Sequence, residues 1–210
     1  MKDLTAEILL RIGAVEFRPE NPFTYASGLK GPIYCDNRKL LSYPVERKKI
    51  VKFFIEKIEN ISESYDYLAG LATAGIPHAS FIAHELEKPM LYVRGKPKSH
   101  GKGNQIEGDY KAGEKLVLVE DLINQGSSLD EAMVGVEEAG LKGVCCVAIV
   151  DYGSLKSKSI SKKWQLPLHS LTDFDTLCET AFKMGLIKSI EQEALYSWRE
   201  DPKLWSENKN

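Results

Sequence analysis

Two unbroken apolar runs, Leu116–Val119 and Val144–Val150, constrain the fold more than any other feature of the sequence. A strand with one face in water alternates apolar and polar residues, so an uninterrupted apolar run predicts a strand covered on both faces. Shorter strands are predicted over Tyr67–Ala72, Met90–Val93 and Leu166–Leu171, and helices over 76–86 and 128–139. This alternation predicts an α/β protein with a doubly wound, mostly parallel sheet flanked by helices.

The two ends of the chain show different patterns. Apolar residues at helical spacing predict a first helix that Gly13 ends, and Phe17–Asp36 is predicted to form short strands and turns. A second helix is expected from Pro44. After the last strand, Asp173 is expected to cap a helix and Ser189-x-x-Gln192 to form the capping box of the next. The lysine-rich 156–163 is interpreted as a solvated loop and the last ten residues as frayed.

Composition excludes several classes of protein. The 210 residues carry a formal net charge of −2, so a basic nucleic-acid-binding surface is not expected. The four cysteines form no CxxC pair, which is typical of a reducing compartment. The N-terminus is a poor signal peptide, and no apolar run is long enough to span a membrane. We therefore expect a soluble, cytoplasmic protein without membrane or nucleic-acid partners.

The segment LVLVEDLINQGSSL, residues 116–129, places two acids and a small-residue loop between a strand and a helix. In open parallel sheets, ligands bind beyond the carboxyl ends of the strands. The N–H groups at a helix start suit a phosphate, and the acids Glu120 and Asp121 could accept hydrogen bonds from sugar hydroxyls. A capped helix start after two solvated acids is the plainer alternative.

Residues 94–113 interrupt the alternation of strands and helices. This stretch of 20 residues holds five glycines and few apolar residues. Up to five cationic groups lie within nine residues: Arg94, Lys96, Lys98, His100 and Lys102. A long loop in a compact domain is usually functional or disordered. Cations on a lid could stabilise a departing diphosphate and exclude water, whereas a solvated charged loop is the alternative.

The strand, the two acids and the phosphate loop together resemble the substrate motif of type I phosphoribosyltransferases. Three further segments resemble orotate phosphoribosyltransferases in particular: FTYASGLKGPIYCDNR (23–38), AGLATAGIPH (69–78) and RGKPKSHGKGNQIEG (94–108). The resemblance implies a single domain over 1–210. It consists of a small N-terminal hood of about 1–43 with helices 173–200 nearby, a core of about 44–172 and a mobile lid over 94–113.

The resemblance also implies an activity and a set of site residues. The expected reaction is pentosyl transfer from phosphoribosyl diphosphate to orotate in pyrimidine biosynthesis, in a homodimer whose lid reaches the partner's site. Mg²⁺ is expected to enter with the diphosphate rather than in a protein cage. Catalytic roles are implied for Arg94, Lys98, His100 and Asp121. Orotate contacts are implied for Asn124 and Tyr34. Phosphoribosyl diphosphate is expected to contact Thr73, Ala74, Gly75, Arg94, Lys98, His100, Glu120, Asp121, Leu122, Ile123, Asn124, Gln125, Gly126, Ser127 and Ser128.

Some positions depart from the pattern of the family. Asn124 replaces a hydroxyl residue near the base, Ala26 replaces a lysine, and Gly95 replaces a second basic residue. Tyr152 stands where some members have an arginine. These departures do not point to a different base. Two rival functions stay open: transfer to another base, such as a purine or uracil, and a non-catalytic nucleotide sensor of the same fold that binds nucleic acid.

The remaining histidines and tryptophans are interpreted as structural. His78 and His84 are expected on a helix, more often at the partial surface than in a site, and His169 at a strand end. Trp164, Trp198 and Trp205 are interpreted as packing or edge residues. None of these residues has metal-ligand spacing, so no protein metal site is expected.

Overall fold

The computed structural model describes residues 1–96 and 105–209, and it divides the chain into two compact units. Residues 45–171 form the larger unit, and residues 1–44 together with 172–210 form the smaller. The two ends of the chain therefore fold together, while the middle of the chain builds a unit of its own. Each unit is described separately below.

The larger unit is built on a six-stranded sheet in the order β10-β9-β8-β5-β6-β7. Its strands are β5 (Tyr67–Leu71), β6 (Met90–Val93), β7 (Ile106–Glu107), β8 (Lys115–Ile123), β9 (Lys142–Asp151) and β10 (Leu168–Asp173). β5 pairs in parallel with β6 and β8, and β8 pairs in parallel with β9, whereas β7 is antiparallel to β6. The predicted α/β architecture with a mostly parallel sheet is confirmed.

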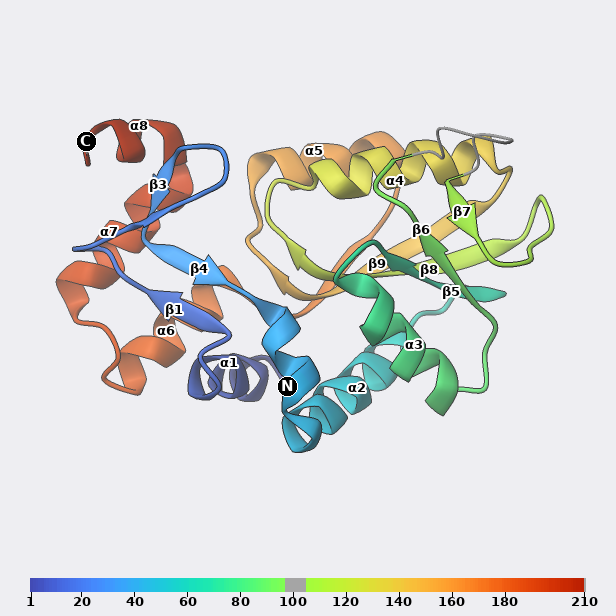
Figure 1. Ribbon diagram of the computed structural model, residues 1–210, viewed down its shortest axis with the longest axis horizontal. Coiled ribbons are helices and arrows are strands. Elements are labelled where there is room, and N and C mark those ends of the chain that lie inside the picture. Colours follow the sequence, from blue (N-terminus) through green and yellow to red (C-terminus); the bar gives the residue numbers. More distant parts are fainter. Residues whose placement is uncertain (97–104, 210) are drawn as a thin grey trace. The chain divides into compact units, whose positions relative to one another are not determined.

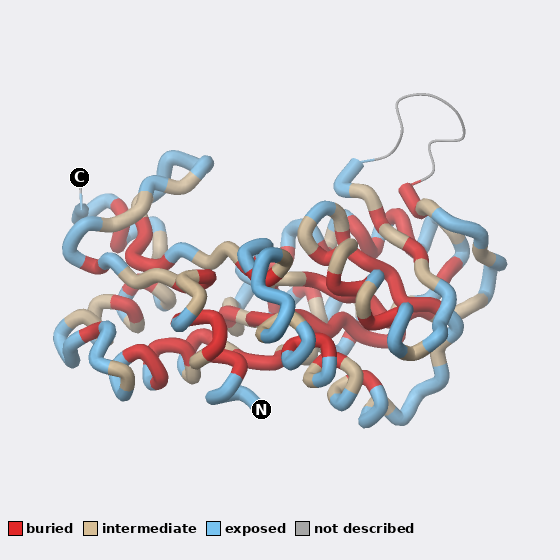
Figure 2. The backbone as a smooth tube through the Cα atoms, turned by 60° about the horizontal axis from the view of Figure 1, so that its bottom comes forward, coloured by how far each residue is buried: buried red, intermediate tan, exposed pale blue. Residues whose placement is uncertain are grey.

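Helices cover both faces of this sheet (Figure 1). α4 (Ser127–Glu138) and α5 (Leu155–Trp164) lie on one face, and α2 (Pro44–Glu59) and α3 (Gly75–Glu85) on the other. Burial runs along most of the length of the central strands, as the tube in Figure 2 shows. This burial explains why β8 and β9 carry apolar residues without alternation.

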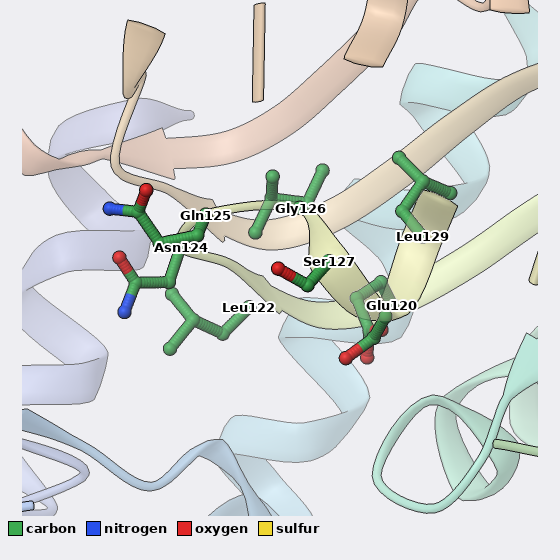
Figure 3. Close-up of a pocket in the computed structure, with 9 residues that line it drawn as sticks. Glu120, Leu122, Asn124, Gln125, Gly126, Ser127 and Leu129 are labelled. Carbon is green, nitrogen blue, oxygen red and sulfur yellow. The ribbon is translucent and has the colours of Figure 1, made fainter. Parts of the chain in front are cut away.

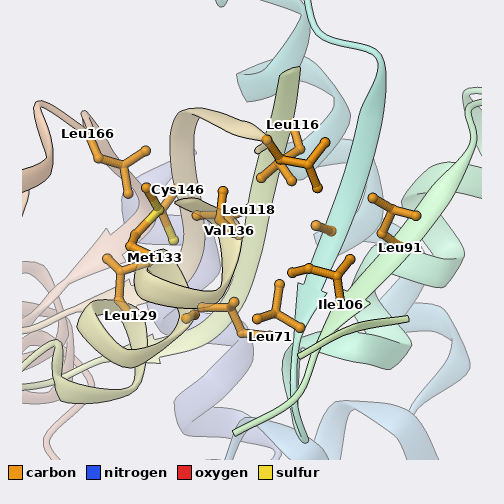
Figure 4. Close-up of a cluster of buried hydrophobic side chains, with 14 of the residues drawn as sticks. Leu71, Leu91, Ile106, Leu116, Leu118, Leu129, Met133, Val136, Cys146 and Leu166 are labelled. Atoms are coloured by element: carbon orange, nitrogen blue, oxygen red, sulfur yellow. The ribbon is translucent and has the colours of Figure 1, made fainter. Parts of the chain in front are cut away.

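The core under α4 and α5 is one continuous apolar cluster (Figure 4). Leu129, Met133 and Val136 from α4 pack against the sheet residues Leu118 and Cys146. Positions 129, 132, 133 and 136 follow the spacing of one helix face, which is why this helix was readable from the sequence. The cluster fixes the first turn of α4 against the carboxyl end of β8, where the predicted phosphate loop lies.

In the part of the chain that the structure describes, the smaller unit consists of two short antiparallel strand pairs, one 3₁₀ helix and four α-helices. β1 (Val15–Phe17) pairs antiparallel with β4 (Ile33–Cys35), and β2 (Phe23–Thr24) with β3 (Lys30–Gly31). The 3₁₀ helix Asn37–Ser42 follows β4. The helices are α1 (Lys2–Arg11), α6 (Phe174–Lys183), α7 (Ser189–Glu200) and α8 (Pro202–Glu207). Their aromatic side chains form the centre of the unit, with the Phe174 and Trp198 rings stacked at 5.9 Å.

Of three sequence expectations about the C-terminal helices, one is confirmed and two are wrong. The cap at Asp173 is confirmed, because its carboxylate accepts a hydrogen bond from the Thr176 N–H at 2.9 Å. The next helix, however, begins one residue earlier than a Ser189 cap requires, and Glu191 accepts from the Lys188 N–H at 2.8 Å. Residues 202–207 are helical rather than frayed, since Trp205 and Ser206 are buried and Ser206 Oγ accepts from the Lys30 N–H at 2.8 Å.

The lysine-rich stretch 156–163 is also helical, not a loop. It lies within α5, where the Ser154 hydroxyl accepts from the Ser157 N–H at 3.1 Å and caps the helix. Ser157 and Ile160 are buried, and the lysines occupy the remaining faces. The interpretation as a loop gave the charge too much weight and the cap too little. No helix in the described ranges is long and apolar enough to cross a membrane.

Candidate active site

The carboxyl ends of the parallel strands bring the predicted phosphoribosyl diphosphate motifs to one edge of the sheet. The turn 72–74 follows β5, and the loop 124–126 follows β8, its parallel neighbour. Gly75 joins the two motifs closely: a Cβ at this position would lie 2.3 Å from the Val119 carbonyl oxygen. Only glycine lets the turn approach the strand that carries the two acids.

The two acids lie inside a strand rather than after it. β8 was expected to end at Val119, but it continues to Ile123, with Glu120 opposite Ala148 and Ile123 opposite Asp151 on β9. Glu120 is buried, and its Oε1 accepts a hydrogen bond from the Asp121 N–H at 2.9 Å. Burial, with Asp121 beside it, raises the pKa of the Glu120 carboxyl. The pairing of β8 with β9 at Glu120 and again at Leu122 therefore positions the backbone on both sides of Asp121 before any substrate arrives.

The phosphate loop lines a pocket of about 190 Å³. Its walls are Glu120 and residues 122–129 (Figure 3). In this view the amides of Asn124 and Gln125 lie at one end and the Glu120 carboxylate at the other. Every other lining residue is neutral, so the pocket offers hydroxyl and N–H donors and one acid.

Gly126 gives this loop its shape. It has φ +77°, a conformation that glycine adopts without steric cost, and it is the N-cap residue of α4. No side chain caps α4, so the first N–H groups of the helix stay open toward the pocket. Open N–H groups and the positive end of the helix dipole together favour a bound anion.

Two hydrogen bonds join Arg94 and Gln105, which both lie in the predicted lid. The Arg94 N–H donates to the Gln105 carbonyl at 2.9 Å, and the Gln105 amide returns a bond to the Arg94 carbonyl at 2.7 Å. Gln105 is buried against Gly135 of α4, where a Cβ would approach its side chain to 2.6 Å. Arg94, at the start of the predicted lid 94–113, is therefore held to Gln105 within it, a feature that the sequence did not reveal.

The remaining predicted site residues do not all belong to the pocket or to the turn after β5. Arg94 lies at the same sheet edge, and its guanidinium donates to Glu107 at 3.2 Å. Lys98 and His100 lie outside the described residues. Tyr34 belongs to the smaller unit, where it is 42% exposed on β4 with its ring 5.3 Å from that of Phe23.

His78 is buried, contrary to the expectation of a partial-surface residue. It is 1% exposed in the first turns of α3, and neither ring nitrogen has a hydrogen-bond partner in the described structure. Burial lowers its pKa to about 4, Asp121 opposes this shift, and Arg47 adds to it. A nearly apolar helix, α3, could have indicated burial of this residue from the sequence.

Comparison with known proteins shows the family. The phosphoribosyl transferase domain model matches residues 38–176. Orotate phosphoribosyltransferase of Bacillus pumilus is 46% identical over 202 residues, covering 96% of this chain and 95% of that protein. The Bacillus subtilis enzyme of the same name is 45% identical, covering 96% and 94%.

A solved structure agrees with these sequence relatives. The crystal structure of orotate phosphoribosyltransferase from Aeropyrum pernix superposes with a TM-score of 0.72 at 27% identity, covering 87% of this chain and 99% of that one. The predicted type I phosphoribosyltransferase fold is thereby confirmed. The acids on β8, the phosphate loop and the near-full-length matches agree, and the chain belongs to the orotate phosphoribosyltransferase family.

Proposed function

We propose that the chain transfers the ribose 5-phosphate of phosphoribosyl diphosphate to orotate, giving orotidine 5′-monophosphate and diphosphate in pyrimidine biosynthesis. The observation that carries this proposal is the 46% identity to an orotate phosphoribosyltransferase over 96% of the chain. The pocket beside Glu120 and Asp121 supports the ribose phosphate half of the reaction on physical grounds. The choice of orotate as the base is supported by the sequence identity to orotate phosphoribosyltransferases.

The proposed chemistry forms a bond from a ring nitrogen of orotate to the ribose carbon as the carbon–oxygen bond to diphosphate breaks. The proton that the ring nitrogen loses goes to the departing diphosphate or to solvent. Positive charge develops on the ribose in the transition state, and the carboxylate of Asp121 would stabilise it while holding a hydroxyl. Glu120, with its raised pKa, would hold the neighbouring hydroxyl. The turn Thr73–Gly75 and the loop Asn124–Ser128 would bind the two phosphate ends.

The lid residues complete this proposal. Lys98, Arg94 and His100 would stabilise or protonate the departing diphosphate, with the lid of one subunit reaching the site of its partner in a homodimer. The hydrogen bonds between Arg94 and Gln105 support this proposal, because they hold Arg94 at the sheet edge where the motif residues lie. Asn124 and Tyr34 are proposed orotate contacts.

Magnesium is proposed to arrive with the diphosphate. The described residues contain no group of three or more His, Cys, Asp or Glu that could hold a metal ion. The carboxylates of Glu120 and Asp121 offer hard oxygen donors, which suit Mg²⁺ held mainly by substrate oxygens. The ion would neutralise charge on the leaving group. A cytoplasmic location is also proposed, and it is supported by cysteines that form no disulfide in the described part of the chain.

A panel of bases tests the proposal. Purified protein with phosphoribosyl diphosphate and Mg²⁺ is given orotate, uracil, adenine or hypoxanthine, and the nucleotide product is identified. We expect product with orotate and, at most, a small fraction of that rate with the other bases. Faster product formation with another base would show that this base, not orotate, is the substrate. Nucleic-acid binding at moderate salt without any turnover would favour the sensor.

A further inference from the structure

The first turn of α5 is attached to the phosphate loop at three successive points. The Ser154 hydroxyl donates to the Asn124 carbonyl at 2.8 Å. Gly126 packs against α5, because a Cβ there would lie 3.1 Å from Ile160 and 3.3 Å from Ser157. The Lys156 ammonium donates to Ser127 Oγ at 2.9 Å. Helix α5 therefore forms part of the loop's support.

This attachment adds a positive charge that the pocket otherwise lacks. The residues that line the pocket include one charged group, Glu120, which is an acid. A phosphate entering the pocket is itself an anion, so neutral donors alone would have to offset repulsion from that acid. The Lys156 ammonium forms no salt bridge in the described part of the chain, but its charge helps to lower the pKa of Asp130. By contrast, Lys163 on the same helix is paired with Asp130 at 2.7 Å.

The hydrogen-bond chemistry gives the charge a direct route to the ligand. A serine hydroxyl can accept one hydrogen bond and donate another. Because Ser127 Oγ accepts from Lys156, its own proton is free to point into the pocket that Ser127 lines. A bond donated by a hydroxyl that an ammonium polarises is stronger than one from an isolated hydroxyl.

We propose that Lys156 is a phosphate-binding residue, acting on the 5-phosphate of the ribose substrate through Ser127 and by its own charge. This inference rests on the proposed phosphoribosyl transfer, but it assigns a role to a residue outside the family motif. The helix that carries Lys156 begins shortly after Tyr152, the position at which some family members have an arginine.

Calorimetric binding of ribose 5-phosphate tests this role without any turnover. We expect Lys156→Ala to raise the Kd for ribose 5-phosphate about tenfold, the effect of losing one charge-assisted hydrogen bond. Lys156→Arg should retain most of the affinity. The matched control is Lys158→Ala, an exposed lysine of the same helix, which should leave the Kd unchanged.

A second variant tests the route through Ser127. In a Ser127→Ala background, we expect Lys156→Ala to raise the Kd less than in the wild type, because the two groups act as one unit. In steady-state assays, Lys156→Ala should raise the KM for phosphoribosyl diphosphate and leave the KM for orotate unchanged. Equal ribose 5-phosphate affinities for Lys156→Ala and Lys158→Ala would overturn the inference. Failure of the wild type to make orotidine monophosphate would instead refute the proposed function.

Discussion

At the residue scale, His78 shows how a buried titratable group couples the site region to stability. Its imidazole is enclosed with the Phe54 ring at 6.2 Å, and its pKa is lowered to about 4 mainly by burial. In the unfolded chain a histidine titrates near its ordinary value of about 6.5. The unfolded state therefore binds more protons than the folded state between these two values, so stability rises with pH across this interval.

This difference predicts a pH dependence of stability that replacement of His78 removes. From pH 6.5 down toward pH 4 the wild type should lose on the order of 3 kcal/mol of unfolding free energy to this group. We expect His78→Phe to lack this part of the loss, whereas His84→Phe, at an exposed position of the same helix, should retain it. Urea unfolding at a series of pH values measures both. Parallel curves for the wild type and His78→Phe would contradict the account.

At the element scale, the sequence predicted those elements whose patterns are local. The apolar runs of β8 and β9 and the helix face of α4 could be read directly, because burial on both faces or on one stripe determines residue type. β7 was not predicted, because a two-residue strand has no period and exists only through its pairing with β6. α5 was missed because its lysines hid a short apolar stripe and a serine cap.

The same limit applies to the site. The motif residues Glu120–Ser128 and Thr73–Gly75 could be identified from sequence, and their closeness follows from the parallel pairing of β5 and β8. The contacts of Lys156 and Gln105 could not be identified, because no helix or strand period relates their partners: Lys156 and Ser127 are 29 residues apart, and Gln105 and Arg94 are 11 apart. Such contacts depend on tertiary packing, which no local pattern encodes.

The hydrogen bond from the Gln105 amide to the Arg94 carbonyl is predicted to stabilise the start of the lid. Gln105→Leu keeps the side-chain volume but leaves the Arg94 carbonyl without its 2.7 Å hydrogen bond. We expect a loss of about 1–2 kcal/mol in unfolding free energy and a lower kcat, because the lid would no longer start from a fixed base. Glu107→Gln, which keeps an acceptor for Arg94, should lose less than about 1 kcal/mol. Equal unfolding free energies for Gln105→Leu and the wild type would show that this hydrogen bond does not stabilise the start of the lid.

At the scale of the whole molecule, the proposed homodimer makes each site depend on both subunits. Lys98→Ala would damage the lid, and Asp121→Asn would damage the ribose site. If the lid acts on the partner's site, a hybrid dimer of these two inactive variants contains one intact site. After random subunit exchange, about half of the dimers are hybrids, so we expect about a quarter of the wild-type activity.

Mixing the purified variants and measuring the recovered rate checks this arrangement. The control is each variant mixed with itself, which should stay inactive. A lid that serves its own subunit would give no recovery, because each subunit would still carry a defect in its only site. A monomer in sedimentation would contradict the arrangement independently.

The central claim is that orotate is joined to ribose at the acids of β8, and one comparison of initial rates tests it most directly. Orotidine 5′-monophosphate formation is measured for the wild type and for Asp121→Asn, which keeps the shape of the side chain but removes its charge. We expect turnover by the wild type and a kcat lower by about 100-fold or more in the variant, with unchanged unfolding free energy. No product from the wild type, or an equal rate from Asp121→Asn, would contradict the claim.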